Sequence, residues 1–349
     1  MLAEEVEELS DRPVTRVTGG VELEGDLVDA AGLALWSRCA ARILVRLAEF
    51  PAASLQQLET EVRRLDLSPV LRKGQPATVK ASVKNARIQR ADVAGKKVSS
   101  ALRLPRSGRH APIELLLRIE GRVGTLSVDA SGLLHKRGYR QATAKAPLRE
   151  NLAASVLRAA GWRPGVPLAD PLCGSGSFSI EAALWARDSA PGLHLKLPVT
   201  RLPGFPSGAW EELVDEARRS VVPQQGWFHT ADRDPGAIKA TRANAERAGV
   251  ALDPLQQDVT EPVDAPDGPG LVVLNPPYGH RVGENVKLAG LYHRIGDSLK
   301  RDYPGWRMVA VCPDKALAGR LAKGVEELTT FRNGGLKVSL FSGEVPQKG

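Results

Sequence analysis

The stretch VPLADPLCGSGSFSIEAALWARD, residues 166–188, decides the fold of this chain. An apolar run ends at Asp170, a turn with two glycines follows, and apolar and small residues then recur at helical spacing from Ser177. Further strands and helices alternate towards the C-terminus. The predicted strands are residues 226–232, 253–258, 271–275 and 306–312, and the predicted helices are residues 148–162, 234–250, 287–302 and 314–324. This alternation predicts an α/β fold with a doubly wound, parallel sheet.

The first 147 residues predict a different, α+β assembly. Its expected elements are a hairpin over residues 14–26, helices over 27–37, 54–65 and 96–103, and strands over 41–50, 78–84, 113–120 and 124–129. The polar and basic residues 130–147 are expected to connect this assembly to the α/β part. Residues 188–225 interrupt the α/β alternation with a Pro- and Gly-rich insertion. The length and this change of pattern predict two or three domains.

The turn after Asp170 has the composition of a ligand-binding loop. Gly174 and Gly176 let the backbone approach a ligand closely, and the next helix offers free N–H groups to an anionic group. The turn is not a dinucleotide fingerprint, because Ser179 occupies the third glycine position, and it lacks the Gly-Lys-Ser/Thr of a P-loop. Cys173 has no basic neighbour that would activate a thiolate, so we expect it to pack rather than react.

Other predicted strands also end on polar residues. Ligands of doubly wound sheets bind outside the carboxyl ends of the strands, so these ends are expected to form one site. Asp232 ends one strand, where a carboxylate can accept both hydroxyls of a ribose, and Asp258 ends the next. A capping or turn role is the alternative at either position.

The sequence Asn275-Pro276-Pro277-Tyr278-Gly279, after an apolar strand, indicates the chemistry. Two prolines fix a rigid turn, which would present the Asn275 side-chain oxygen and the Pro276 carbonyl as outward-facing acceptors. An exocyclic base amine is a poor nucleophile, and two acceptors that hold its hydrogens would direct its lone pair at a methyl group. Tyr278 offers a ring face to an unstacked base. Such transfer works by positioning and needs no metal. An ordinary Pro-Pro turn is the alternative.

Positive charge is concentrated in the middle of the chain. Residues 61–150 contain 20 Lys and Arg against seven Asp and Glu, whereas the net charge of the whole chain is +8. A basic stretch of this kind is typical of a polyphosphate-binding surface, and a solvated face without a partner is the alternative. No apolar run is long enough to span a bilayer. Three distant cysteines without a CxxC pair favour a reducing cytoplasm and argue against a zinc site.

The glycine turn and the Asn-Pro-Pro-Tyr sequence, in this order, resemble those of class I methyltransferases that act on base amines. The resemblance extends to GGVELEGD (19–26), LWSRCAARILVRLAEFPA (35–52), LHKRGYR (134–140), APLRENLAA (146–154), APGLH (190–194) and NGGL (333–336). Over nearly the whole chain it is to guanine-N2 RNA methyltransferases that carry a THUMP domain, most of all the bacterial enzymes of 23S ribosomal RNA. tRNA enzymes of the same architecture are the first alternative. DNA adenine-N6 methyltransferases and a non-catalytic RNA-binding protein are more remote.

The resemblance implies a ferredoxin-like piece over residues 1–50, a THUMP RNA-binding domain over 51–132, a linker over 133–147 and a Rossmann-like, seven-stranded methyltransferase domain over 148–349. It also implies S-adenosylmethionine as the cofactor, S-adenosylhomocysteine as its product, and no metal. The residues expected to hold the cofactor are Asp170, Pro171, Cys173, Gly174, Ser175, Gly176, Asp232, Asp258, Val259 and Asn275. The residues expected to hold the target guanine are Asn275, Pro276, Pro277 and Tyr278. The residues expected to contact RNA phosphates are Lys80, Lys84, Arg87, Lys96, Lys97, Arg137 and Arg140.

The chain differs from the family pattern at both ends. It begins with MLAEEVEEL (1–9), inside the first helix, so we expect the ferredoxin-like piece to lack its first strand. It ends after FSGEVPQKG (341–349), so we expect a single activity. We also expect no obligate protein partner.

Overall fold

The computed structural model describes residues 1–105, 113–141, 148–277, 285–333 and 335–347. The chain forms two compact units. Unit 1 comprises Met1, His135–Pro191 and Arg218–Gly349, and unit 2 comprises Leu2–Leu134 and Gly192–Ala217. Among the described helices, none combines the length and the apolar character that crossing a bilayer requires.

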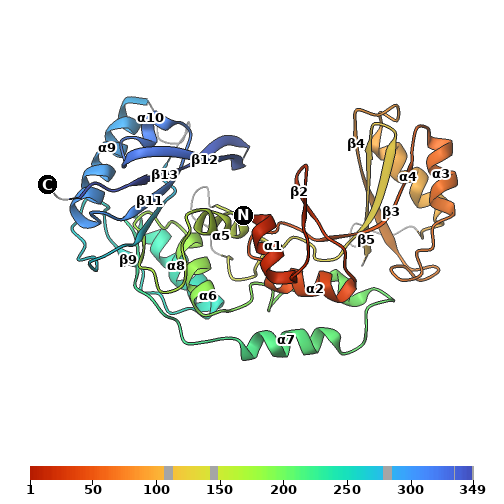
Figure 1. Cartoon of the computed structure of the whole chain (residues 1–349), viewed down its shortest axis with the longest axis horizontal. Helices are drawn as coiled ribbons and strands as arrows, with labels where there is room; N and C mark the ends of the chain where they lie inside the picture. Colours follow the sequence, from red (N-terminus) through yellow and green to blue (C-terminus); the bar gives the residue numbers. More distant parts are fainter. Residues whose placement is uncertain (106–112, 142–147, 278–284, 334, 348–349) are drawn as a thin grey trace. The chain divides into compact units, whose positions relative to one another are not determined.

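Unit 1 is built on a sheet whose described strands number seven, in the order β12-β13-β11-β10-β7-β8-β9. The strands are β7 (Leu168–Asp170), β8 (Phe228–Asp232), β9 (Leu255–Gln256), β10 (Leu271–Leu274), β11 (Arg307–Cys312), β12 (Lys323–Asn333) and β13 (Leu336–Glu344). The helices are α5 (Glu150–Ala159), α6 (Ser177–Ala186), α8 (Pro235–Ala248), α9 (Asn285–Asp302) and α10 (Lys315–Ala318). These elements make up most of the green to blue ribbon in Figure 1. The predicted α/β class is confirmed.

The sheet departs from the predicted all-parallel arrangement at one strand. Strands β9, β8, β7, β10 and β11 are parallel, whereas β13 is antiparallel to both β11 and β12. Asn333 of β12 pairs with Leu336 of β13, so only two residues connect these strands. A connection this short can join only antiparallel neighbours. The helix predicted over residues 314–324 is also shorter than expected, since α10 stops before Gly319.

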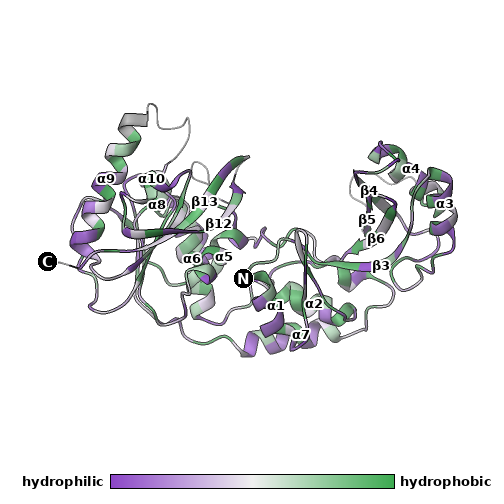
Figure 2. Cartoon of the chain, turned by 45° about the horizontal axis from the view of Figure 1, so that its top comes forward, coloured by the Kyte–Doolittle hydropathy of each residue, from purple (hydrophilic) through white to green (hydrophobic). Residues whose placement is uncertain are grey.

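Successive side chains of each strand point to opposite faces of the sheet, and helices cover both faces. One set of alternate side chains, which includes Val272 and Met308, packs with α9. The other set, which includes Leu271 and Val309, packs with α5 and α6. Figure 2 shows the matching pattern of hydropathy, with hydrophobic residues along the strands and a mixture of hydrophobic and hydrophilic residues along α9. This three-layer packing holds the carboxyl ends of the parallel strands at one edge.

Unit 2 contains a hairpin, β1 (Thr15–Val17) and β2 (Gly20–Glu22), and a sheet of four described strands in the order β3-β6-β5-β4. The strands of that sheet are β3 (Leu44–Pro51), β4 (Ala77–Lys84), β5 (Ile113–Glu120) and β6 (Val123–Asp129). The helices are α1 (Leu2–Ser10), α2 (Leu27–Trp36), α3 (Leu55–Arg63) and α4 (Ala91–Ala101). Helices α3 and α4 lie side by side on one face of the sheet (Figure 1). This is the α+β assembly that the sequence predicts.

Residues 192–217 belong to unit 2, although they lie within the range 148–349 predicted as one methyltransferase domain. They form a short helix, η1 (Pro198–Arg201), and most of α7 (Ala209–Arg219). Leu197, Val199 and Leu202 are buried in the same apolar cluster as α2 and the four-stranded sheet. Their packing is between segments distant in sequence, which a local apolar pattern does not reveal.

Candidate functional site

The turn between β7 and α6 has a shape that requires glycine. Gly174 and Gly176 have φ values of +57° and +81°, a region that side chains disfavour. A Cβ atom on Gly176 would lie 2.7 Å from Thr241 Cγ2. The Gly174 N–H donates to Asp232 Oδ2 at 3.0 Å, and Thr241 Oγ1 donates to the Gly174 carbonyl at 3.0 Å. The turn is therefore tied to both β8 and α8.

A second residue of α8 also holds the turn. Asn244 is fully buried, and its Nδ2 donates to the Ser175 carbonyl at 3.0 Å. Neither Thr241 nor Asn244 was predicted from the sequence. The signal that could have identified them is their spacing, because residues three apart share a helix face, and the other buried residues of this helix are alanines and one isoleucine.

Asp170, at the end of β7, is a buried carboxyl that is only partly paired. Its side chain is 1% exposed, and its Oδ2 accepts a hydrogen bond from Ser179 Oγ at 3.0 Å. Its Oδ1 has no hydrogen-bond partner among the described residues. Burial raises the pKa of Asp170 to about 7, the hydrogen bonds from Ser179 oppose this shift, and the nearby Asp232 charge adds to it.

Ser175 Oγ and Asn275 Oδ1 share this condition. Both atoms are buried, and both lack a hydrogen-bond partner within the described part of the chain. A buried polar atom left unpaired costs about 1–3 kcal/mol, and folded proteins contain few of them. Three such atoms, on residues at the ends of the neighbouring strands β7 and β10, indicate a site that a polar ligand completes.

Asp232 and Asp258 both have the turn role that was the alternative in the sequence. Asp232 Oδ1 accepts from the Asp234 N–H at 2.9 Å. Asp258 Oδ1 accepts from the Thr260 N–H at 3.0 Å and from its hydroxyl at 2.7 Å, and these bonds lower the pKa of Asp258. A carboxylate oxygen has two lone pairs, so each residue keeps acceptor capacity for a ligand.

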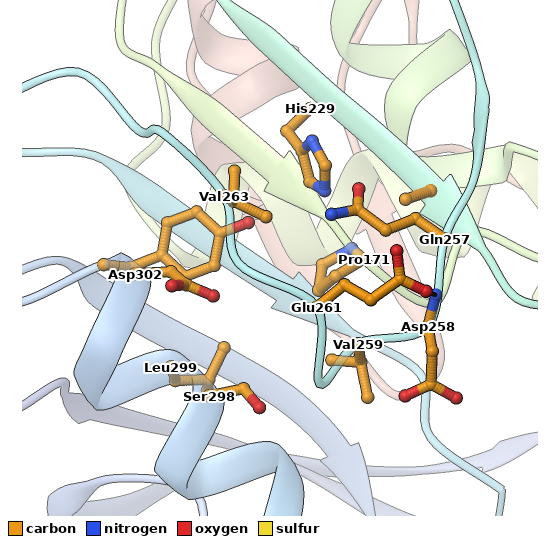
Figure 3. Close-up of a pocket in the computed structure, with 12 residues that line it drawn as sticks. Pro171, His229, Gln257, Asp258, Val259, Glu261, Val263, Ser298, Leu299 and Asp302 are labelled. Atoms are coloured by element: carbon orange, nitrogen blue, oxygen red, sulfur yellow. Dashed lines mark hydrogen bonds between the residues drawn. The ribbon is translucent and has the colours of Figure 1, made fainter.

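A pocket of about 250 Å³, including the solvent at its mouth, lies beside β8 and β9. Three predicted residues line it, namely Pro171, Asp258 and Val259 (Figure 3). The lining residues that were not predicted are His229, Ala231, Gln257, Glu261, Val263, Ser298, Leu299, Asp302 and Tyr303. Several of them lie at the end of α9 or within β8, and no motif in the sequence marks those positions.

Two titratable side chains that line this pocket, His229 and Tyr303, have shifted pKa values because they are buried. Burial lowers the pKa of His229, while the Asp302 charge raises it by a smaller amount. Burial also raises the pKa of Tyr303, whose hydroxyl has no hydrogen-bond partner among the described residues. Both side chains are therefore uncharged at neutral pH.

The Asn275-Pro276-Pro277 turn follows β10, the strand next to β7. Register pairs Leu271 with Leu168, so the two strands end side by side, and the turn lies beside the glycine turn. Asn275 Oδ1 is buried rather than outward-facing as predicted. The Pro277 carbonyl accepts from Tyr292 Oη at 3.5 Å, which links the turn to α9. Tyr278 lies outside the described residues.

Two predicted RNA contacts, Arg137 and Arg140, are wrong. The Arg137 side chain is 1% exposed and lies 3.6 Å from the fully buried Glu181 carboxylate. Arg140 is 12% exposed and donates to Glu150 Oε2 at 2.8 Å and to the Leu148 carbonyl. Polar residues in a predicted linker looked solvent-exposed, but here they pair with buried carboxylates inside unit 1.

The remaining predicted RNA contacts do not share one surface. Lys80 and Lys84 lie on the face of β4 opposite α4, where they pair with Glu114 and Glu120. Lys97 lies on α4 and pairs with Glu59 of α3. Arg87 and Lys96 are exposed. A phosphate that contacts any of the three paired lysines must compete with a carboxylate.

Cys173 packs, as predicted. Its side chain is 7% exposed, and burial raises the pKa of its thiol well above the usual value. A thiol in this state is a poor nucleophile, so its Sγ, 3.7 Å from Thr241 Oγ1, belongs to the support of the glycine turn.

The sheet order, the glycine turn and the polar strand ends define a class I methyltransferase fold. Residues 137–340 match the family of RMKL-like methyltransferase domains, and the chain belongs to this family. Residues 1–44 match the RlmL ferredoxin-like domain, in agreement with the predicted N-terminal piece. The protein is therefore a methyltransferase of the RMKL-like type.

Solved structures resemble this chain over its whole length. A possible methylase from Clostridium difficile 630 has 26% sequence identity and a TM-score of 0.87, with 100% of this chain and 95% of that chain covered. A predicted N6-adenine-specific DNA methylase from Listeria monocytogenes has 26% identity and a TM-score of 0.86, with 99% and 93% covered. SMU.472, solved in complex with SAH, has 25% identity and a TM-score of 0.85, with 99% and 95% covered.

Proposed function

We propose that this protein transfers a methyl group from S-adenosylmethionine to the exocyclic N2 amine of a guanine in RNA, with 23S ribosomal RNA as the substrate. The observation that carries the proposal is Asn275 Oδ1, which has no hydrogen-bond partner among the described residues and follows β10 in a rigid Pro-Pro turn. Asp170 Oδ1 and Ser175 Oγ, at the end of the neighbouring strand β7 and in the glycine turn after it, share this condition. tRNA is the alternative substrate, because the same amine chemistry applies to it.

The donor side of the proposal rests on how the site suits S-adenosylmethionine. Its methionine part has an ammonium group, which needs acceptors such as Asp170 Oδ1, and a carboxylate, which needs N–H donors such as those at the start of α6. Asp232 would bind the ribose, while Asp258 and Val259 would face the adenine from the pocket they line. SMU.472, a relative of similar fold, was solved with SAH.

On the acceptor side, Asn275 and Pro276 would hold the hydrogens of the guanine amine. S-adenosylmethionine supplies a methyl group on a sulfonium, whose carbon–sulfur bond breaks as the new carbon–nitrogen bond forms. Asn275 Oδ1 and the Pro276 carbonyl would stabilise the positive charge that grows on the nitrogen. The extra proton can then leave to solvent, so no dedicated base is required. Tyr278 would stack on the guanine.

Unit 2 would bind the RNA. We assign residues 51–132 as the THUMP domain, residues 133–147 as the linker, and Arg87 and Lys96 as phosphate contacts, because both are exposed cations in the basic part of the chain. Lys80, Lys84 and Lys97 would join them only by exchanging a carboxylate partner for a phosphate. Cys39, Cys173 and Cys312 are free thiols, which suits an enzyme of the cytoplasm.

Incubation of the purified protein with deuterium-labelled S-adenosylmethionine and separate 23S rRNA, tRNA and DNA tests the proposal. Nucleoside mass spectrometry should detect labelled N2-methylguanosine from 23S rRNA. Asn275→Ala should lower turnover by about two orders of magnitude or more while changing donor affinity only slightly, because the amine contact is strongest in the transition state. Ser155→Ala is the control and should retain full activity, because the Ser155 hydroxyl donates to the Asn151 carbonyl within α5 and belongs to neither turn.

Each alternative has its own product. Label in tRNA alone keeps the chemistry and replaces the substrate. Labelled N6-methyl-2′-deoxyadenosine from DNA would favour the activity named for the Listeria relative. Near-normal turnover of Asn275→Ala would contradict the proposed hold on the amine.

A further inference from the structure

Two buried hydroxyl groups, those of Thr230 and Ser179, form a chain of hydrogen bonds that ends at Asp170. Thr230 Oγ1 donates to Ser179 Oγ at 2.9 Å, and Ser179 Oγ donates to Asp170 Oδ2 at 3.0 Å. Ser179 lies in the first turn of α6 and is 0% exposed, while Thr230 lies in β8 and is 2% exposed. Three adjacent elements therefore meet in one chain of hydrogen bonds.

The chain has a fixed direction. The Ser179 hydroxyl donates its only hydrogen to Asp170, so it must accept a hydrogen bond from Thr230. The bond from Thr230 to Ser179 and the bond from Ser179 to Asp170 strengthen each other by polarisation. The Ser179 N–H also bonds to Asp170. Asp170 Oδ2 is therefore fixed by a hydrogen bond from Ser179, while Asp170 Oδ1 has no hydrogen-bond partner among the described residues.

Burial alone would keep Asp170 protonated. The ionisable groups acting on it within the described residues are Asp232, whose charge disfavours ionisation of Asp170, and the buried thiol of Cys173. The hydrogen bonds from Ser179 act in the opposite direction and favour the ionised form. Ser179 occupies the position of the third glycine in a dinucleotide fingerprint, so a hydroxyl stands here where that motif has no side chain.

We propose that Ser179 and Thr230 are positioning residues, which hold the Asp170 carboxylate through its Oδ2 and aim its Oδ1 at the cationic α-ammonium group of the methyl donor. The inference rests on the proposed function, since it concerns how the same site recognises its donor. Neither hydroxyl touches the donor, and both act through Asp170.

This arrangement couples donor binding to pH. The carboxylate must be ionised to bind the ammonium group, so donor affinity should rise as the pH increases through the pKa of Asp170, which is about 7. Removal of the Ser179 hydroxyl removes a bond that lowers this pKa, so the rise in affinity should move to higher pH. At neutral pH, binding should also release a proton from the fraction of Asp170 that is still protonated.

Calorimetric titration from pH 5.5 to 8.5 tests the proposal with two probes. S-adenosylhomocysteine keeps the ammonium group, whereas 5′-methylthioadenosine keeps the adenosine part and lacks the amino acid part. Ser179→Ala should weaken S-adenosylhomocysteine binding at pH 7 by about tenfold, in the range expected for a hydrogen bond to a charged group. It should leave 5′-methylthioadenosine binding within about twofold.

Thr230 supplies a second, independent pair of variants. Thr230→Val keeps the shape and removes the hydroxyl, so it should shift the pH profile in the same direction as Ser179→Ala but less. Thr230→Ser keeps the hydroxyl and should restore the wild-type profile. If Ser179→Ala does not fold, the two Thr230 variants still test the proposal. Ser155→Ala is the control substitution of a serine outside the site.

The outcomes separate this inference from the proposed function. If wild-type protein does not bind S-adenosylhomocysteine, the proposed cofactor is wrong and the inference fails with it. If wild-type protein binds it, but Ser179→Ala and Thr230→Val leave both affinity and pH profile unchanged, only the role of the two hydroxyls is overturned. An equal loss for both probes would also overturn it, because that result indicates a general structural defect.

Discussion

Substitution of Gly176 by alanine should damage the site more than substitution of another glycine with a similar backbone. Gly176 has φ +81°, and its new Cβ would lie 2.7 Å from Thr241 Cγ2, closer than real Cβ contacts allow. A left-handed backbone costs a non-glycine residue about 1–2 kcal/mol, and overpacking of a close-packed site adds about 1–3 kcal/mol. Gly176→Ala should therefore destabilise unit 1 by about 2–5 kcal/mol.

Gly165→Ala is the matched control. Gly165 has φ +91°, but a Cβ there would meet nothing within 4 Å, so only the backbone cost of about 1–2 kcal/mol applies. Thermal unfolding of both variants measures the difference, at about 2–4 °C per kcal/mol for a unit of this size. Gly176→Ala should also lose the stabilisation that S-adenosylhomocysteine gives, whereas Gly165→Ala should keep it. Equal melting temperatures and equal donor binding would refute the reasoning.

Three further changes test other parts of the structure. Arg137→Met leaves Glu181 buried without its cation and should destabilise unit 1 by about 3–5 kcal/mol in thermal unfolding, without changing the salt dependence of RNA binding. A shallower salt slope would return this arginine to the RNA surface, because loss of a phosphate contact reduces the number of counterions released. Tyr292→Phe removes the hydrogen bond to the Pro277 carbonyl in the Asn-Pro-Pro turn, so it should lower kcat severalfold and leave donor affinity unchanged. An equal loss of kcat and of donor affinity would indicate misfolding. Replacement of residues 192–217 by a Gly-Ser linker should remove the cooperative unfolding of unit 2, since each buried Leu or Val contributes about 1.5–3 kcal/mol to its stability. If circular dichroism still shows the unfolding transition of unit 2, this prediction is contradicted.

Local sequence patterns predicted the core of unit 1 well. The strand that ends at Asp170, the glycine turn and the helix from Ser177 all lie where the apolar spacing placed them. Asp314 caps α10 through the Leu317 N–H at 2.9 Å, at the first residue of the helix predicted over 314–324. Strand ends, glycines and caps are encoded within a few residues, so the sequence alone can identify them.

Features that depend on distant contacts were not predictable in this way. Arg137 looked like part of a solvated linker, because nothing near it in the sequence shows that Glu181 lies beside it in the core. The same limit applies to residues 192–217, whose apolar side chains have their partners in unit 2. Thr230 and Ser179 are 51 positions apart, so their hydrogen bond could be found only in the folded chain.

The most direct test of the central claim is mass spectrometry of nucleosides from separated 23S rRNA and tRNA, taken from cells with and without this gene. N2-methylguanosine should decrease in 23S rRNA when the gene is absent, while its level in the tRNA pool should stay the same. Loss from tRNA alone would contradict the proposed substrate. Unchanged N2-methylguanosine in both pools would contradict the proposed chemistry.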